Sequence, residues 1–315
     1  MTQNPAGSAA GRPADDPADE ATGHFVAHRE LLFRLVYNML GSVADAEDVL
    51  QETWLSWASR GGGAPPAEVA HPRAYLARIA VNHALRRRSA ISRRQETYVG
   101  PWLPEPLVAP PGEDEDPALR NESVSLAMLV VLESLTPLER AVFVLHEVFG
   151  YAHTEIAGIL DRSPAAVRQL AHRARSHVHA RRPRYEAHPR VRREATERFV
   201  RAALGGDLGG LLEILAPDVT VWTDGGGSRR PAGLRPVRGR DKAARLITAH
   251  ATRHDPRGLE LRYRRVNGDE AAVLFDGDAA YAVMVMDLTP DGERVSGVYI
   301  VTNPEKLTHV RKEEA

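Results

Sequence analysis

Apolar residues recur at helical spacing over residues 25–57, and this pattern predicts two helices near the start of the chain. A Gly-Ser pair interrupts the run, and Ser42 or Asp45 is placed to cap the second helix. A third apolar run predicts a helix over residues 73–94. Residues 1–23 are rich in Ala, Pro, Gly and Asp and have few apolar side chains, so we expect a disordered tail there.

Helical periodicity stops at a proline-rich stretch, residues 98–122. Four prolines between Pro101 and Pro110 exclude a regular helix or a central strand. We therefore predict a linker, but one with anchoring residues that a plain spacer lacks. The apolar residues in question are Tyr98, Trp102, Leu103 and Leu107.

A helix-turn-helix is predicted within a helical pattern that spans residues 123–180. Residues 154–160 form a short amphipathic run, Asp161 to Ser163 supply a tight turn, and Pro164 suits the first position of the next helix. That second helix is rich in arginine, and in this motif it is the second helix that enters the major groove of DNA. A helical hairpin with a solvated face is the structural alternative.

The pattern changes beyond Pro183 to a mixture of helices and alternating strands, which predicts an α+β domain. The helices expected there span residues 191–204, 208–215 and 242–250. The strands expected there begin at 219–222 and continue with 259–266, 270–275, 279–287 and 294–302.

The length of 315 residues exceeds what one hydrophobic core usually serves, so two or three domains are expected. An apolar fraction of 43% with 26% charged residues is typical of a soluble globular protein. Cysteine is absent, which excludes disulfides, thiolate metal sites and cysteine nucleophiles. No apolar run approaches the roughly 20 residues of a membrane helix, and the start of the chain lacks the features of a secretory signal. We therefore expect a cytoplasmic protein without a membrane contact.

The net charge is −1, but the positive charge is concentrated in two segments. Residues 73–94 and residues 162–185 each contain seven arginines and no acidic residue. The acidic residues lie elsewhere, notably over residues 45–52 and 113–116. Two basic segments on a nearly neutral chain indicate two separate contacts with a polyanion such as nucleic acid. A solvated helix face is the alternative for either segment alone.

Two stretches carry a resemblance to a known family. Residues 135–151 begin Leu-Thr-Pro-Leu-Glu-Arg and lead into the predicted helix-turn-helix, and residues 31–57 contain Ala-Glu-Asp-Val-Leu-Gln-Glu-Thr at 46–53. In order and spacing they resemble region 4 and region 2 of the extracytoplasmic-function (ECF) sigma factors of RNA polymerase. The resemblance covers roughly residues 24–185.

Three further strings resemble one subgroup of these factors, whose members carry a SnoaL-like C-terminal domain. They are Trp-Leu-Pro-Glu-Pro-Leu at 102–107, Asp-Gly-Gly-Gly-Ser at 224–228 and Asn-Pro-Glu-Lys-Leu at 303–307. The implied fold is multidomain, with two all-α sigma domains (a region 2 helical bundle and a region 4 helix-turn-helix) and an α+β SnoaL-like cone. The implied division is a tail at 1–23, region 2 at 24–97, the linker at 98–122, region 4 at 123–185 and a regulatory SnoaL-like domain at 186–315.

The resemblance implies an alternative sigma factor that binds core RNA polymerase and directs promoter-specific initiation of transcription. Its partners would be the β′ coiled coil and the β subunit of the polymerase, together with promoter DNA. Many relatives have aspartate where this chain has Arg86, a departure that bears on promoter preference. The residues implied in β′ binding are Asp48, Gln51 and Glu52. Those implied near the −10 element are Asn82, Arg86, Arg87 and Arg88, and those implied near the −35 element are Arg168, Gln169, His172, Arg173 and Arg175.

The same resemblance implies that the C-terminal domain meets the linker and modulates activity. The glycines after Asp224 allow backbone geometries that larger residues avoid. Ser228 replaces the lysine of the family string and so removes one charged group. A plain hairpin turn is the alternative interpretation of residues 224–228. The residues expected at this contact are Trp102, Leu103, Pro104, Asp224, Gly225, Gly226, Gly227, Asn303 and Lys306.

Two other classes of function stay open. A conventional activator or repressor would need only the helix-turn-helix and would bind duplex DNA without polymerase. An enzyme tethered to the genome would use Asp224, His250 or Asp287 as a general base, with Trp222 and Tyr281 as pocket walls. The sequence places no oriented acid beside any of these bases, so we expect no catalytic residue.

No cofactor or metal is expected from the sequence. His172, His177 and His179 are spaced so that they do not share one helix face, and no acidic residue lies near them. A small-molecule ligand of the C-terminal domain is the one further partner left open.

Overall fold

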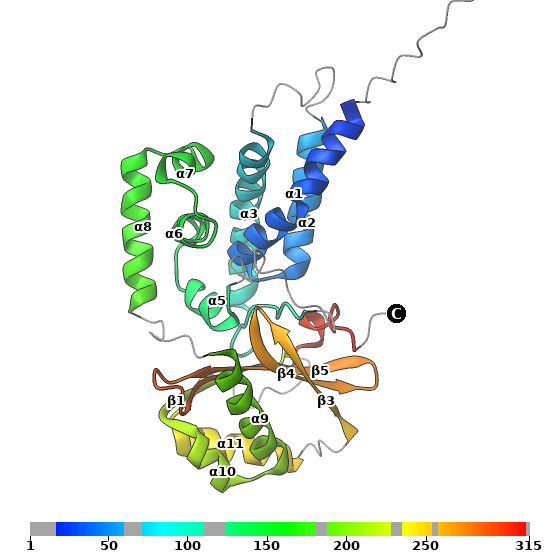
Figure 1. Ribbon diagram of the computed structural model, residues 1–315, viewed down its shortest axis with the longest axis vertical. Helices are drawn as coiled ribbons and strands as arrows, with labels where there is room; N and C mark the ends of the chain where they lie inside the picture. Colours follow the sequence, from blue (N-terminus) through cyan, green and yellow to red (C-terminus); the bar gives the residue numbers. More distant parts are fainter. Residues whose placement is uncertain are drawn as a thin grey trace, which may run out of the picture.

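The computed structural model describes residues 17–59, 71–109, 124–180, 188–227, 235–253 and 258–312. Helices make up the first half of this described chain, and one mixed β-sheet with helices on its far face makes up the second half (Figure 1). Residues 110–122 of the predicted linker, residues 181–185 of predicted region 4 and Ser228 lie outside the described residues.

Three helices near the start of the chain pack together as a bundle: α1 (Pro17–Leu40), α2 (Val43–Ser59) and α3 (Pro72–Glu96). A glycine in the left-handed region separates α1 from α2. Ser42 caps α2, because its Oγ accepts a hydrogen bond from the amide of Asp45 (3.2 Å). The three predicted helices are therefore present.

The first helix begins at Pro17, so the tail predicted for residues 1–23 is wrong after residue 16. Ala21 is buried, and its carbonyl accepts a hydrogen bond from the indole Nε1 of Trp57 (2.9 Å). This tertiary contact continues the helix through a segment that has few apolar residues of its own. Residues 1–16 lie outside the described residues.

A second helical group contains the predicted helix-turn-helix. Asp161 adopts a left-handed conformation (φ +52°) that ends one helix, and Ser163 Oγ accepts from the amide of Ala166 (3.2 Å) to cap the next. Pro164 occupies the first turn of that helix, as the sequence predicted. The elements of this group are α5 (Leu126–Leu132), α6 (Pro137–Phe143), a π-helical turn (Val144–Val148), α7 (His153–Leu160) and α8 (Pro164–His179).

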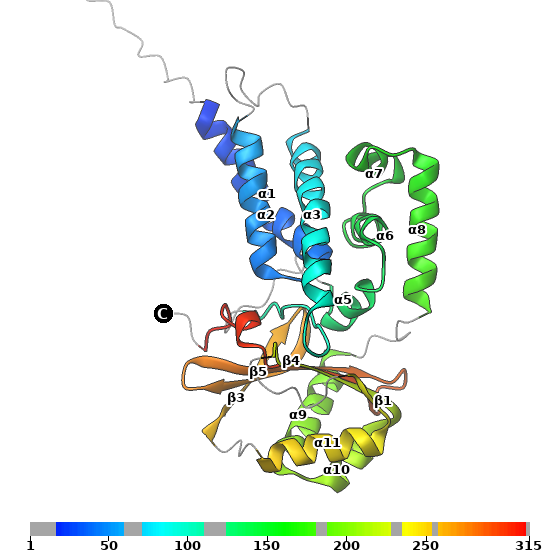
Figure 2. The ribbon, with the colours of Figure 1, turned by 180° about the vertical axis from the view of Figure 1, so that it is seen from behind.

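The two helical groups share one hydrophobic core. Helix α3 contacts both α6 and α7, and the three lie side by side in both views (Figures 1 and 2). At the N-terminal end of α3, the guanidinium of Arg73 lies 5.8 Å from the ring centroid of Tyr151. The helix-turn-helix is thus packed directly against the first bundle.

The C-terminal half is a six-stranded sheet in the order β2-β1-β6-β5-β4-β3. Strand β1 runs parallel to β6, and all other neighbours are antiparallel. The strands are β1 (Leu215–Asp224), β2 (Val237–Arg238), β3 (Glu260–Val266), β4 (Asp269–Asp276), β5 (Ala279–Leu288) and β6 (Val295–Val301). The sequence did not predict β2, because a strand of two residues shows no alternation.

Both faces of the sheet are covered. Helices α9 (Pro189–Gly205), α10 (Leu208–Ile214) and α11 (Arg240–Arg253) pack on one face. Helix α5, the linker and the C-terminal segment pack on the other (Figures 1 and 2). Neighbouring residues of a strand point to opposite faces, so Val221 faces α9–α11 while Trp222 faces α5 and the linker.

Candidate functional site

Asp224 lies at the end of β1, and its side chain is fully buried. Its carboxylate binds the linker. Its Oδ2 accepts hydrogen bonds from the amide of Leu103 (2.9 Å) and from Nζ of Lys306 (2.8 Å). Its Oδ1 accepts from the hydroxyl of Tyr98 and from the amide of Gly226 (3.2 Å). One side chain of the sheet domain therefore binds the linker at two points.

Lys306 comes from the 3-10 turn at Pro304–Lys306 and is buried against the same stretch of linker. Its ammonium donates to the carbonyl of Leu103 and lies 3.5 Å from the ring centroid of Trp102. Burial lowers the pKa of Lys306, and the charge of Asp224 opposes that effect. The ion pair and the aromatic ring together replace the water that a buried ammonium would lose.

Asn303 and Gly226 complete this contact. Asn303 Nδ2 donates to the hydroxyl of Tyr98 (2.9 Å), and its Oδ1 accepts from the amide of Glu305 (3.1 Å). Gly226 has φ +66°, and a Cβ there would lie only 2.3 Å from Cγ of Asn303. Only glycine fits, so this position of the predicted Gly-rich loop is fixed by its close approach to Asn303, which in turn binds Tyr98 of the linker.

The remaining residues predicted at this contact lie around it. Leu103 is fully buried in the core between the sheet and α5. Pro104 and Gly225 are buried beside it, and Gly227 lies at the surface near Val99. All the residues predicted for the interdomain contact are thus brought into one neighbourhood.

Glu105 is a linker residue that sequence reasoning missed. Its Oε2 accepts from the amide of Val43 (2.5 Å), and its Oε1 accepts from Oγ of Ser42 (2.9 Å). The carboxylate therefore caps the N-terminus of α2, where an anion is stabilised by the helix dipole. The backbone of Glu105 bonds the same region, accepting from Tyr37 Oη (2.6 Å) and donating to Gly41 (2.9 Å). The only sequence signal was an acid flanked by two prolines.

Asn267 is a second missed residue, in the turn between β3 and β4. Its Oδ1 accepts from the amide of Leu107 (3.1 Å), and its Nδ2 donates to Tyr37 Oη (2.7 Å). Its own amide donates to the carbonyl of Leu107 (2.9 Å), so the linker pairs with this turn as an edge strand would. Asn267 adopts φ +53°, which asparagine tolerates better than most residues.

A buried charge cluster joins the two helical groups. Glu133, just after α5, pairs with Nη2 of Arg88 (2.6 Å) and with Nη1 of Arg140 (2.5 Å). Gln95 donates to the same carboxylate (2.9 Å), and Arg140 Nε donates to the carbonyl of Asn38 (2.9 Å). Burial raises the pKa of Glu133, but the charges of Arg140 and Arg88 outweigh it and lower the pKa to about 2. The cluster therefore connects α1, α3, α5 and α6.

The predicted −10 residues are not equally placed. Arg86 is exposed on α3, whereas Asn82 is half-buried and donates to the carbonyl of Arg78 (2.9 Å). Arg88 is only 6% exposed and is held by Glu133, so it is not available to DNA in this arrangement, and its DNA contact stays a prediction. Arg87 is half-buried and is paired with two acidic residues of α2. The arginine run faces both solvent and protein, because successive helical residues point in different directions.

The predicted polymerase-binding residues Asp48, Gln51 and Glu52 are all exposed on α2. Asp48 pairs with Arg87, and Glu52 Oε2 lies 2.9 Å from Nδ1 of His83. The same face includes Leu55, whose 59% exposure is unusual for a leucine in a bundle. Leu55 belongs to the apolar run at residues 25–57, whose helical spacing did not predict an exposed position for it.

The predicted −35 residues lie on α8 along its outward face. Arg168, Gln169 and His172 are exposed and line a shallow hollow on the surface. Arg173 Nε and Arg175 Nε each lie 2.9 Å from a carboxylate, of Glu139 and Glu147 respectively. Four of the five side chains are thus exposed, and Arg175 is half-buried. Arg173 and Arg175 pair with acids of the same helical group.

A cavity of about 220 Å³ lies between α9, α11 and the sheet. His250 and Tyr281 line it, but Trp222, which the sequence suggested as a wall, faces the opposite side and stacks on Tyr299. Asp224 also lies on that opposite side, and Asp287 accepts from the hydroxyl of Tyr299 (3.2 Å). The candidate bases are therefore not brought together in one pocket.

Within the described ranges, no cluster of three His, Asp or Glu side chains is arranged to hold a metal ion. Across the same ranges, no helix is both long enough and apolar enough to cross a membrane.

The sequence profiles of three families match the chain. They are Sigma-70 region 2 over residues 24–94, Sigma-70, region 4 over residues 125–178, and the SnoaL-like domain over residues 196–303. Together with the observed helices and mixed sheet, these matches confirm the predicted fold class.

Individual proteins and one solved structure are similar to the chain over nearly its whole length. ECF RNA polymerase sigma factor SigJ of Mycobacterium tuberculosis is 37% identical over 296 residues, covering 90% of this chain and 92% of that protein. The probable ECF RNA polymerase sigma factor SigI of the same species is 30% identical over 300 residues, covering 94% and 97%. The crystal structure of M. tuberculosis SigJ superposes with a TM-score of 0.69 at 35% identity, covering 91% of this chain and 98% of that chain.

Proposed function

The chain belongs to the ECF RNA polymerase sigma factors, and on that premise we propose that its C-terminal domain holds the two sigma regions closed until initiation requires them to separate. ECF sigma factors direct promoter-specific initiation of transcription with core RNA polymerase. They are not a class of enzymes, and we expect this chain to turn over no substrate. We expect it to act in the cytoplasm, where the polymerase and the chromosome are.

The observation that carries the proposal is that regions 2 and 4 share a single core. The names of the −10 and −35 elements place them about 25 base pairs apart, which is about 85 Å at 3.4 Å per base pair. Here α3 contacts α7, and α7 contacts α8, so the two DNA-facing helices lie within about two helix diameters, or roughly 20 Å. Reading both elements at once therefore requires the two regions to move apart.

The charged residues fit a closed arrangement as well. Arg87, implied in DNA binding, pairs with Asp48, implied in binding the polymerase, and with Asp45 (2.7 Å). Burial raises the pKa of Asp45, but its hydrogen bonds from Arg87 and Arg94 outweigh burial and lower it. These ion pairs join α2 and α3 within region 2, so separation of regions 2 and 4 would leave them in place. Arg88, which pairs with Glu133 of region 4, is the arginine that opening would free.

The linker supports the closed arrangement from the C-terminal domain. Asp224 and Lys306 bind residue 103 of the linker, while Glu105 caps α2 two residues further on. Region 2 is thereby fixed relative to the sheet, and α5 of region 4 packs on the same sheet face. Loss of the hydrogen bonds from Asp224 and Lys306 to the linker should therefore favour separation of regions 2 and 4.

The test is run-off transcription with core RNA polymerase on a promoter that depends on this factor. The full chain is compared with Lys306→Met, which removes one partner of the buried ion pair. Lys312→Met is the matched control, because Lys312 pairs with Glu260 (2.6 Å) away from the linker. We expect more transcript from Lys306→Met and no change from Lys312→Met.

Two results would count against this function. Equal transcript from all three chains would remove the regulatory role of the linker contact. Absence of any added-protein-dependent transcript, together with absence of binding to core polymerase, would favour an ordinary DNA-binding regulator.

A further inference from the structure

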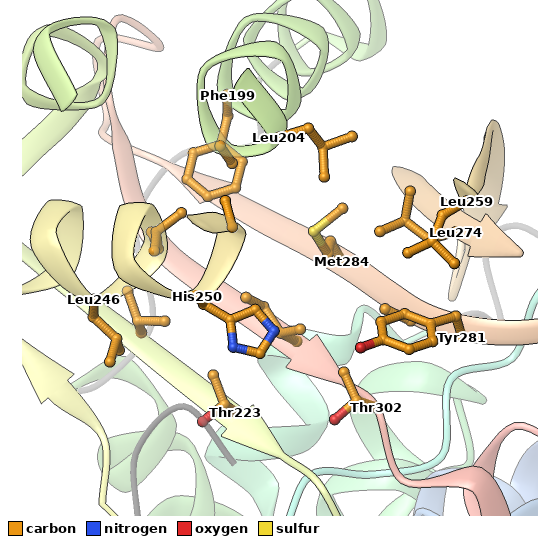
Figure 3. Close-up of a pocket in the computed structure, with 16 residues that line it drawn as sticks. Phe199, Leu204, Thr223, Leu246, His250, Leu259, Leu274, Tyr281, Met284 and Thr302 are labelled. Carbon is orange, nitrogen blue, oxygen red and sulfur yellow. The ribbon is translucent and has the colours of Figure 1, made fainter. Parts of the chain in front are cut away.

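The cavity in the C-terminal domain is built mainly from apolar side chains. Phe199, Leu204 and Met284 form one side of it, from α9 and β5 (Figure 3). Phe199 is fully buried, so this side is part of the hydrophobic core of the domain. A preformed apolar cavity of this kind is a binding site for an apolar group.

The opposite side of the cavity carries polar atoms. The hydroxyls of Thr223, Thr302 and Tyr281 and the imidazole of His250 gather there (Figure 3). No Asp, Glu, Lys or Arg is among the described residues that line the cavity. Among these described residues a fully charged ligand would find no counter-ion, whereas a hydroxyl or carbonyl oxygen would find hydrogen-bonding partners.

The size of the cavity limits the ligand. An apolar cavity of about 150 Å³ holds one benzene molecule. A cavity of about 220 Å³ therefore suits a molecule of roughly nine to ten non-hydrogen atoms, by simple scaling from that case. A peptide, a nucleotide or a lipid chain is too large for it.

Two cavity residues are covalent neighbours of the residues that hold the linker. Thr223 precedes Asp224 in β1, and Thr302 precedes Asn303 just after β6. In each pair the threonine borders the cavity, while the next side chain points through to the linker side. The two sites thus occupy opposite faces of the same strand ends.

A hydrogen bond connects the sites more directly. Thr302 Oγ1 donates to the backbone carbonyl of Asp224 (3.2 Å), and the amide of Thr302 donates to the same carbonyl (2.7 Å). A ligand oxygen that accepts from Thr302 Oγ1 would draw the hydroxyl away from that carbonyl. The position of Asp224, and with it the grip on Leu103, would then change.

We propose that this cavity binds a neutral, mainly apolar molecule of about ten non-hydrogen atoms with one hydroxyl or carbonyl oxygen, and that binding loosens the linker through Thr302 and Asp224. The consequence for transcription rests on the proposed function. The binding site and its effect on the linker do not, because both are properties of the free chain.

Binding is tested by calorimetric titration of the full chain with 2-naphthol, naphthalene and 2-naphthoate. We expect saturable binding of 2-naphthol, about fivefold weaker binding of naphthalene for the loss of one hydrogen bond, and no binding of the anion. Ala251→Leu on α11 narrows the cavity and should weaken 2-naphthol binding about tenfold. Ala249→Leu places the same side chain on the exposed face of α11 and should leave binding unchanged.

The effect on the linker is tested by hydrogen exchange of residues 98–109, which include the Leu103 amide bound to Asp224. We expect 2-naphthol to speed this exchange about threefold in the full chain and in Ala249→Leu, but not in Ala251→Leu. Naphthalene at saturation should leave the exchange unchanged, because it has no oxygen to compete for Thr302.

Three results overturn the proposal: no saturable binding of 2-naphthol, equal binding by Ala251→Leu and the unaltered chain, or unchanged linker exchange at saturating 2-naphthol. Since no arm contains polymerase or promoter DNA, a failure here is separate from a failure of the transcription experiment.

Discussion

Asp224 at the end of β1 and Lys306 in the C-terminal 3-10 turn form an ion pair with side chains that are 0% and 4% exposed, and both bind the backbone of Leu103. The linker backbone is therefore part of the same hydrogen-bonded cluster. Because each charge depends on the other for compensation, loss of one leaves the other buried without an opposite charge.

Lys306→Met should lower the free energy of unfolding by about 3 kcal/mol, as expected for removal of one partner of a buried pair. Denaturant unfolding followed by circular dichroism measures this. Lys312→Met, which removes an ion pair with the more exposed Glu260, should cause a much smaller loss. Equal losses in the two variants would mean that the buried pair contributes no more than the surface pair.

Gly226→Ala should open the linker contact, because the new methyl group cannot fit against Asn303. We expect a loss of at least about 2 kcal/mol and faster proteolysis within residues 98–109. Gly277→Ala is the matched control in the β4–β5 hairpin, with φ +60° and no atom within 4 Å of its Cβ. Gly277→Ala should lower the free energy of unfolding by about 1 kcal/mol through backbone strain alone, and the linker should stay resistant to proteolysis. Similar proteolysis of both variants would contradict the role given to Gly226.

The contact between regions 2 and 4 should weaken in acid because of Glu133. Its pKa is about 2 in the folded chain and 4.5 for an ordinary glutamate, so its contribution is full above about pH 5 and is lost as the pH falls toward 2. The difference corresponds to about 3 kcal/mol. Thermal unfolding between pH 6 and pH 3 measures this dependence.

Glu133→Gln should reduce both the stability at neutral pH and its decline in acid. The surface variant Glu293→Gln should retain the pH dependence of the unaltered chain. If Glu133→Gln kept the same decline, another group would have to account for it.

Arg86 and Arg88 should give opposite outcomes despite being two residues apart. Arg86→Ala removes an exposed cation and should weaken promoter binding by the holoenzyme, with the salt slope of binding reduced by about 1. Its melting temperature should be unchanged. Arg88→Ala should lower the melting temperature of the free chain, because it leaves Glu133 short of one partner. Filter binding and calorimetry separate the two effects, and identical profiles would refute the assignment of Arg88 to the interior.

Local patterns predicted the secondary structure well because their causes are local. The helix-turn-helix depended on Ser163 as a cap and Pro164 after it, and both occupy the expected places. Strands β3 to β6 followed from the alternation of apolar and polar residues. Region identity came from strings that resemble a family, and the profile matches confirmed it.

Long-range choices were not visible in the sequence. Arg86 and Arg88 belong to one basic run, and only the packing of α5 and α6 on α3 decides which of them is buried. Strand alternation places Trp222 and Val221 on opposite faces of the sheet, but it does not say on which face the cavity lies. Glu105 reaches Val43 across 62 positions, a distance over which composition carries no information.

The anchors of the linker also fix the number of residues that it can contain. Leu103 binds Asp224, Glu105 caps α2 and Leu107 bonds Asn267, so every second residue has a separate anchor. One inserted or deleted residue would displace one end by about 3.3 Å, which exceeds the length of a hydrogen bond. A substitution in this stretch affects at most one anchor, whereas an insertion or deletion shifts the register and breaks several anchors together. The spacing between the anchors is therefore constrained more tightly than the identity of the residues that separate them.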